Sequence, residues 1–146
     1  MSKRFTFKVY PTGMARSVYR TIQVSDSETL DTLCAVIVGA FNFYHEHLYE
    51  FCMDNKPYHP GNFQAAPQPG ELSTKIRLNR LNLVKGQNFS LHYDFGDDWM
   101  FTIHVQTIEE EEAETSPALI NSKGKIKQYP SWDEDEEEEE DDEDWE

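Results

Sequence analysis

The stretch that decides the fold reads Leu91-His92-Tyr93-Asp94-Phe95-Gly96-Asp97-Asp98-Trp99. Apolar and polar residues alternate into it from Phe89 and alternate again from Trp99 to Val105, which is the period of a strand with one buried face. Between the two alternating segments, glycine tolerates positive φ and aspartate side chains accept hydrogen bonds from nearby amides. The stretch therefore predicts a hairpin that turns at 96–98 and buries an aromatic face.

Periodicity predicts the remaining elements. Alternation indicates strands at 4–9, 18–24 and 47–53, and three- and four-residue spacing of apolar residues indicates a helix at 30–41 with Thr29 or Ser27 as N-cap. A loop is expected at 58–73, a short strand at 75–78, a helical turn at 79–83, and no regular structure after Ile108. We therefore expect an α+β fold: a mainly antiparallel sheet, one principal amphipathic helix packed on it and a long C-terminal hairpin.

The charge is concentrated at one end of the chain. The 146 residues carry a net charge of −15, and thirteen of the fourteen positions in 133–146 are acidic. Through Ile108, ten acidic residues balance ten lysines and arginines. We expect a single domain at 1–130 and a disordered acidic tail at 131–146, because like charges repel and bury no apolar surface. The near-neutral domain argues against nucleic-acid binding, whereas the acidic tail suits a basic protein partner.

Other features favour a cytoplasmic protein. No segment approaches the roughly 20 apolar residues that a membrane span needs, and the first residues lack the apolar run of a signal peptide. Cys34 and Cys52 stand in apolar segments without the spacing of a zinc site, so we expect reduced, buried thiols. The oligomeric state is left open.

The turn is also the first candidate site. Asp94, Asp97 and Asp98 place three carboxylates around it, and hard cations such as Mg²⁺ or Ca²⁺ prefer carboxylate ligands. The alternative is that these aspartates shape the turn and cap its amides. A second arrangement, built from His92, His104 and Asp94, has the ligand types of a two-histidine, one-carboxylate metal site. Apart from a divalent cation, no cofactor is expected.

Four further side chains are candidates for binding. Arg16 and Arg20 could bind an anion or pair with a carboxylate, and Trp132 and Trp145 flank the acidic run and could anchor a partner. No nucleophile motif such as Gly-x-Ser-x-Gly occurs. The leading hypothesis is a non-enzymatic binding domain whose acidic tail engages a basic partner. The alternative is a metal-dependent, phosphodiester-type enzyme that uses the aspartate turn.

The hairpin also resembles a known family. Residues 93–99 are similar to the signature of the plasmid pRiA4b ORF-3-like family, also described as an insertion-element passenger, TnpR-like domain. Residues 19–24, 30–41 and 47–51 resemble further segments of that pattern, and the resemblance runs from about residue 3 to 130. It implies that the signature residues, Tyr93, Phe95, Gly96 and Trp99, shape the fold.

What the resemblance implies about function is limited. It implies an α+β domain of bacterial or mobile-element distribution, without an established activity, and adds mobile-element-associated DNA binding as a third hypothesis. Many relatives carry a histidine two residues after the tryptophan, where this chain has Phe101. No role of that histidine carries over to this chain.

Overall fold

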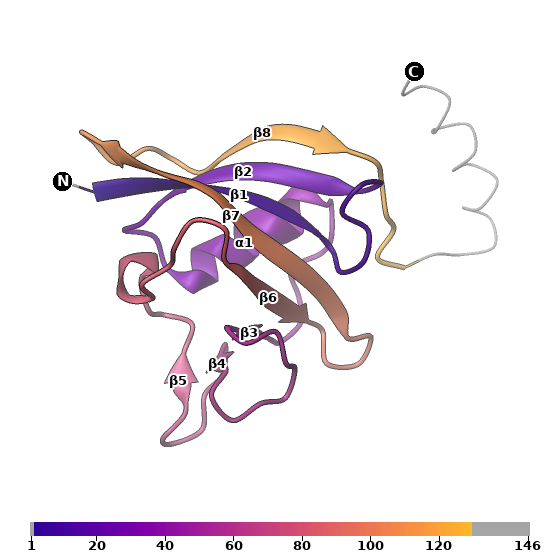
Figure 1. Cartoon of the computed structure of the whole chain (residues 1–146). Helices are drawn as coiled ribbons and strands as arrows, with labels where there is room; N and C mark the ends of the chain where they lie inside the picture. The colour runs from indigo at the N-terminus through magenta and orange to yellow at the C-terminus, as the bar shows by residue number, and fades with distance from the viewer. Residues whose placement is uncertain (1, 130–146) are drawn as a thin grey trace.

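Eight strands form one sheet in the computed structural model, which describes residues 2–129 of the chain (Figure 1). The strands are β1 (Ser2–Pro11), β2 (Tyr19–Ser25), β3 (Tyr49–Cys52), β4 (Phe63–Gln64), β5 (Leu72–Ser73), β6 (Asn88–Tyr93), β7 (Trp99–Glu111) and β8 (Ala118–Lys123). Their order across the sheet is β5-β4-β3-β6-β7-β1-β2-β8. One α-helix, α1 (Leu30–Ala40), and a 3-10 turn, η1 (Leu78–Arg80), complete the elements of the described residues.

The centre of the sheet is β7, which pairs antiparallel with β6 on one side and with β1 on the other. The β6–β7 register places Tyr93 opposite Trp99, so the quoted stretch turns the chain through 94–98. The β1–β7 register runs from Ser2 opposite Glu111 to Pro11 opposite Phe101, with one irregularity after Thr6. The hairpin turn therefore lies at one end of the longest strand of the sheet.

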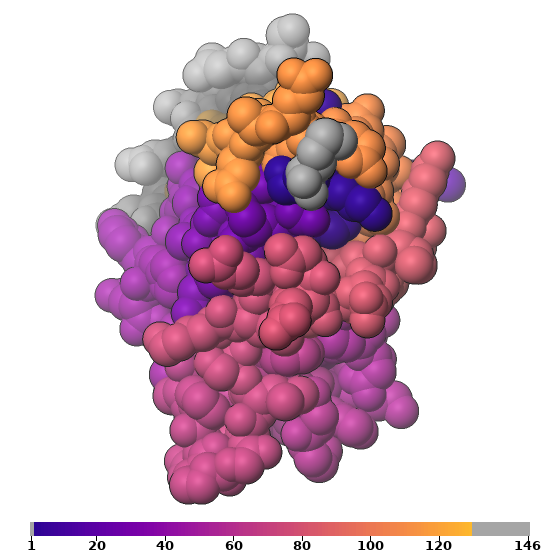
Figure 2. Space-filling view, turned by 90° about the vertical axis from the view of Figure 1, so that its left-hand side faces the viewer, coloured from indigo at the N-terminus to yellow at the C-terminus, as the bar shows by residue number. Residues whose placement is uncertain are grey.

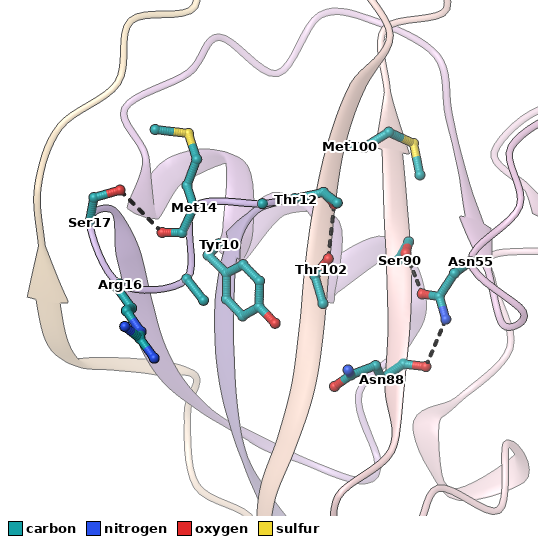
Figure 3. Close-up of a pocket in the computed structure, with 12 residues that line it drawn as sticks. Tyr10, Thr12, Met14, Arg16, Ser17, Asn55, Asn88, Ser90, Met100 and Thr102 are labelled. Atoms are coloured by element: carbon teal, nitrogen blue, oxygen red, sulfur yellow. Dashed lines mark hydrogen bonds between the residues drawn. The ribbon is translucent and has the colours of Figure 1, made fainter.

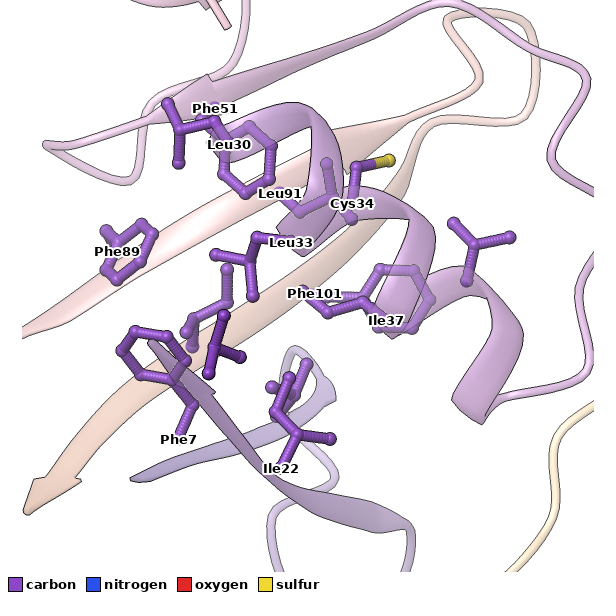
Figure 4. Close-up of a cluster of buried hydrophobic side chains, with 14 of the residues drawn as sticks. Phe7, Ile22, Leu30, Leu33, Cys34, Ile37, Phe51, Phe89, Leu91 and Phe101 are labelled. Carbon is purple, nitrogen blue, oxygen red and sulfur yellow. The ribbon is translucent and has the colours of Figure 1, made fainter. Parts of the chain in front are cut away.

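Helix α1 begins where the sequence predicts a cap. The Thr29 hydroxyl accepts a hydrogen bond from the Thr32 amide at 3.1 Å. Figure 4 shows α1 lying over side chains of β1, β2, β3, β6 and β7. The fully buried members of this core include Phe7, Ile22, Leu30, Leu33, Cys34, Ile37, Phe51, Phe89, Leu91 and Phe101.

The opposite face of the sheet is polar, because strand residues alternate between the two faces. On neighbouring strands it carries Glu50 opposite His92, His92 opposite Met100, and Ser90 opposite Thr102. The loop between β3 and β4 folds over part of this face, since the Tyr58 amide donates to Glu50. Figure 2 shows another side of the molecule, where the pink and salmon segment around β5 and η1 lies below the orange ends of β7 and β8.

The expected fold class, an α+β domain with a principal helix on a mainly antiparallel sheet, is wrong. The described residues are mostly strand, the sheet is mixed because β4 and β5 run parallel, and α1 spans 11 residues. The expectation missed β4 and β5 inside the expected loop at 58–73, and it missed β8 after the glutamates. The hairpin is not the C-terminal element, because β8 follows it and pairs with β2.

The short elements also differ from expectation. The expected strand at 75–78 is replaced by an isolated bridge between Thr29 and Arg77, followed by η1. All six residues of β8 are exposed, so its sequence lacks the alternation that marks a strand with one buried face. Within residues 2–129, no helix has the length and apolar character needed to cross a membrane.

Candidate functional site

The aspartate turn is built by its own first residue. Asp94 adopts a φ of 70°, in the left-handed region that Asp tolerates better than most residues. Its Oδ1 accepts hydrogen bonds from the amides of Gly96 at 3.0 Å and Asp97 at 3.3 Å. Asp94 is therefore a turn-forming residue, as the alternative interpretation of the sequence has it.

Asp98 points to the polar face of the sheet instead. Its Oδ1 lies 2.7 Å from Nε2 of His92, and Nδ1 of the same ring lies 2.7 Å from Oε2 of Glu50. His92 and Glu50 are both only 1% exposed. The three side chains form a continuous Glu50–His92–Asp98 chain that joins β3, β6 and the turn.

Glu50 is held as a carboxylate by four donors. Besides His92, it accepts hydrogen bonds from the Tyr58 amide at 2.7 Å, Asn62 Nδ2 at 3.0 Å and Gln64 Nε2 at 2.8 Å. Burial raises the pKa of Glu50, but these hydrogen bonds outweigh burial, so its pKa is lowered. Since both oxygens of an ionised carboxylate only accept hydrogen bonds, Nδ1 of His92 is the donor to Glu50.

Asp98, on the other side of the His92 ring, is also ionised. Hydrogen bonds from His92 and from Tyr58 lower the pKa of Asp98. Each ring nitrogen of His92 thus lies against a carboxylate oxygen, so the ring is held between Glu50 and Asp98. A ring with both nitrogens engaged offers neither of them to a substrate, so the geometry favours a structural role for the Glu50–His92–Asp98 cluster, called the clasp below, over a general base.

Tyr58 covers this clasp from the solvent side. Its hydroxyl donates to Asp98 Oδ1 at 2.8 Å and lies 3.1 Å from the carbonyl oxygen of Phe95. Its ring meets the His92 ring edge-on, with centroids 4.8 Å apart, although the residue is 61% exposed. The loop between β3 and β4 is thus attached to the turn as well as to Glu50.

Two of the four signature residues, Tyr93 and Trp99, support the hairpin from the helix side. Phe95 packs instead against His92 on the polar face, with ring centroids 4.9 Å apart, and Gly96 is exposed in the turn. Tyr93 is fully buried, and its hydroxyl accepts the amide of Glu46 at 2.8 Å and donates to the carbonyl of Tyr44. Trp99 packs against Phe43 with ring centroids 4.8 Å apart. The position where many relatives carry histidine, Phe101, points into the core, so a polar side chain there would be buried.

The remaining candidates are dispersed. His104 bonds Asn88 rather than His92, so the two-histidine arrangement does not assemble, and Asp97 is exposed. Among residues 2–129, no three His, Cys, Asp or Glu side chains form a group that could hold a metal ion. The divalent cation at Asp94, Asp97 and Asp98 stays a prediction, and the three carboxylates do not converge.

Arg20 is not an ion-pair residue on the surface. Its guanidinium donates to three backbone carbonyl oxygens, those of Ala40 at 2.8 Å, Tyr19 at 2.8 Å and Lys123 at 3.0 Å. It also lies 4.7 Å from the centroid of the Phe41 ring. Arg20 therefore ties the end of α1 to the end of β8, and none of these contacts involves an anion.

A groove lies beside the clasp on the same polar face. It encloses about 660 Å³ between the β1–β2 loop and Asn55, and its floor includes Tyr10, Ser90 and Thr102 (Figure 3). Met14 and Met100 add apolar surface. Among the candidate residues named from the sequence, Arg16 lines this groove, and Arg20 does not. The rest of the lining comes from the β1–β2 loop, Asn55 and strands that meet only in the folded sheet.

Sequence reasoning did not identify Glu50, Tyr58 or Asn62 as site residues. One signal was present: Glu50 is the only charged residue in the otherwise apolar run of β3, and a charge in a strand with buried neighbours needs a partner. That partner, His92, follows only from the strand register. Trp132, Trp145 and the acidic tail lie outside the described residues.

Comparisons with known proteins agree with the resemblance. The model of the plasmid pRiA4b ORF-3-like protein family matches residues 3–130. No curated protein is significantly similar to the chain. Among solved structures, it is similar to MM3350, a protein of unknown function from Methanosarcina mazei Go1, with a TM-score of 0.69. The two are 23% identical over 84% of this chain and 70% of that chain, which shows a shared fold alone.

Proposed function

The chain belongs to the plasmid pRiA4b ORF-3-like family, and from its geometry we propose that it is a non-catalytic interaction domain whose acidic tail engages a basic partner protein. The observation that carries the proposal is the state of His92. Both nitrogens of this buried ring are engaged by carboxylates, at 2.7 Å each. The residue best suited to acid–base chemistry at neutral pH is thus used to hold the fold.

The thiols support the same proposal. Cys34 and Cys52 are free and buried, as the sequence predicts. Burial, reinforced by the charges of Glu50 and Asp54, raises the pKa of Cys52 to about 12. Burial also raises the pKa of Cys34. Since the thiolate is the nucleophile, neither side chain is prepared for nucleophilic catalysis.

The distribution of charge supports a basic partner. Thirteen acidic residues in 133–146 follow a domain whose charges balance through Ile108. A field of one sign attracts an oppositely charged protein and speeds its association. Because exposed charges are screened by salt, the association should weaken steeply as ionic strength rises.

The test is capture of partners by the full chain and two matched triple variants. One replaces Glu137, Glu138 and Glu139 of the acidic tail by Gln, and the control replaces the exposed residues Glu110, Glu112 and Glu114. We expect the tail variant to lose basic proteins that the control retains. Equal capture by both variants, or captured proteins that are not basic, would contradict the proposal.

A further inference from the structure

The groove on the polar face presents hydrogen-bond donors rather than acceptors. Oδ1 of Asn55 accepts the Ser90 hydroxyl, and Oδ1 of Asn88 accepts Nδ1 of His104 at 2.7 Å. The amide oxygens that line the groove are therefore already engaged. Within residues 2–129, no hydrogen bond engages the Tyr10 hydroxyl, which points into the groove in Figure 3, or the Asn88 side-chain amide nitrogen. A ligand rich in acceptor oxygens fits such a lining.

The charge of the groove also favours a ligand with negatively charged oxygens. Arg16 is the charged residue of the lining, no carboxylate lines it, and the Arg16 side chain has no ion pair with any residue in 2–129. Lys8 extends the positive charge along the sheet, because its ammonium lies 5.8 Å from the Tyr10 ring centroid and 4.5 Å from that of Tyr19. In a chain with a net charge of −15, this is a local positive site. It attracts carboxylates.

We propose that this groove binds acidic peptide segments and that its occupant is the acidic tail of the same chain. Seventeen residues follow Tyr129, and an extended segment of that length reaches about 55 Å. A domain of this size has a radius of gyration of about 14 Å, so the tail can reach either face. Because the acidic tail is attached to the same chain, its effective concentration at the groove is in the millimolar range. Free anions at micromolar concentrations compete poorly with it.

The apolar part of the lining agrees with this occupant. Met14 and Met100 flank the groove, and methionine sulfur packs favourably against aromatic rings. The acidic tail carries one tryptophan before its acidic run and one near its end, Trp132 and Trp145. The inference deepens the proposed function, because a basic partner would then compete with the groove for the acidic tail.

The experiment places a nitroxide on the acidic tail of the ¹⁵N-labelled full chain through Glu139→Cys. The two native thiols are buried and have raised pKa values, so the introduced cysteine is the one that reacts. We expect loss of the amide signals of Thr12, Asn88 and Thr102 at low salt, and their return in 1 M NaCl. Arg16→Glu should restore these signals, whereas Arg80→Glu, an exposed charge reversal on η1, should not.

Each other outcome overturns the proposal. Full groove signals at low salt would show that the acidic tail is not bound there. Loss that survives Arg16→Glu would show that the charge of the groove plays no part. A further sample mixes a ¹⁵N chain that lacks the nitroxide with a ¹⁴N chain that carries it. Loss of the groove signals in this sample would assign the contact to a second copy of the chain. Because no partner is present, this result is independent of the capture experiment, and either proposal can fail alone.

Discussion

Replacing His92 by Leu tests the interpretation of the Glu50–His92–Asp98 chain most directly. The substitution removes the central ring and leaves the Glu50 carboxylate buried with one of its four hydrogen bonds lost. Breaking a buried pair from one side costs about 3–5 kcal/mol. Domains have unfolding free energies of about 5–15 kcal/mol, so the loss is a large share of the total.

The assay is equilibrium unfolding in urea, followed by far-ultraviolet circular dichroism, for the wild-type chain and two variants. His104→Leu is the matched control, because His104 lies on the same face of the sheet and bonds only the exposed Asn88. We expect it to change the unfolding free energy by about 0.5 kcal/mol or less. A His92→Leu cost below about 1 kcal/mol would refute the structural role assigned to the buried His92 ring between two carboxylates.

The same variant has a predicted pH dependence. The folded pKa values of Glu50 and Asp98 are lowered, so these groups bind fewer protons in the folded state than in the unfolded chain at acidic pH. Their contribution to stability is present above the unfolded pKa values and is lost as the pH falls through the folded pKa values. Without His92 both pKa values move back toward normal. As the pH decreases in the acidic range, the unfolding free energy of the His92→Leu variant should therefore fall less steeply than that of the wild-type chain.

Three other predictions concern separate parts of the molecule. Gly124→Ala should destabilise the fold by at least about 1–2 kcal/mol, because φ is +74° and the new Cβ would lie 2.2 Å from the Ser17 carbonyl oxygen. Thermal unfolding measures this loss of stability, and an unchanged midpoint would contradict the prediction. The two native thiols should resist a disulfide reagent at pH 8 until denaturant is added, and rapid reaction of the folded chain would show that burial does not protect them. A divalent cation at the aspartate turn predicts saturable Mg²⁺ binding by calorimetry that Asp97→Ala abolishes and the Glu137–Glu138–Glu139 triple variant retains; no saturable binding would remove this prediction.

Local chemistry made part of the fold predictable. A strand at 18–24, a turn at 96–98 and a cap at Thr29 or Ser27 each follow from a few neighbouring residues. The structure has β2 at Tyr19–Ser25, a turn at 94–98 and the cap at Thr29. β8 could not be found in this way, because it is an exposed edge strand defined by its pairing with β2. Missing it, together with β4 and β5, is what made the α+β expectation wrong.

The candidate site was less predictable for the same reason. The three aspartates are adjacent in the sequence, yet the fold sends Asp94 to the turn amides and Asp98 to His92. Glu50 and His92 are 42 positions apart and meet only because β3 and β6 are neighbours in one register. Proximity in sequence predicted a cluster that the strand geometry divides.

The place of β7 has a consequence for how the chain folds. β1 and β2 are neighbours in the sequence as well as in the sheet. On its other side, β1 pairs with β7, and Ser2 lies opposite Glu111. Closing a loop of that length is slow, because its entropic cost precedes the reward of the contacts it allows. Without β7, Phe7 and α1 lack the core side chains that β7 contributes, which include Phe101 and Ile103. A chain that stops before Trp99 would therefore leave the facing edges of β6 and β1 unpaired, and unpaired edges favour aggregation.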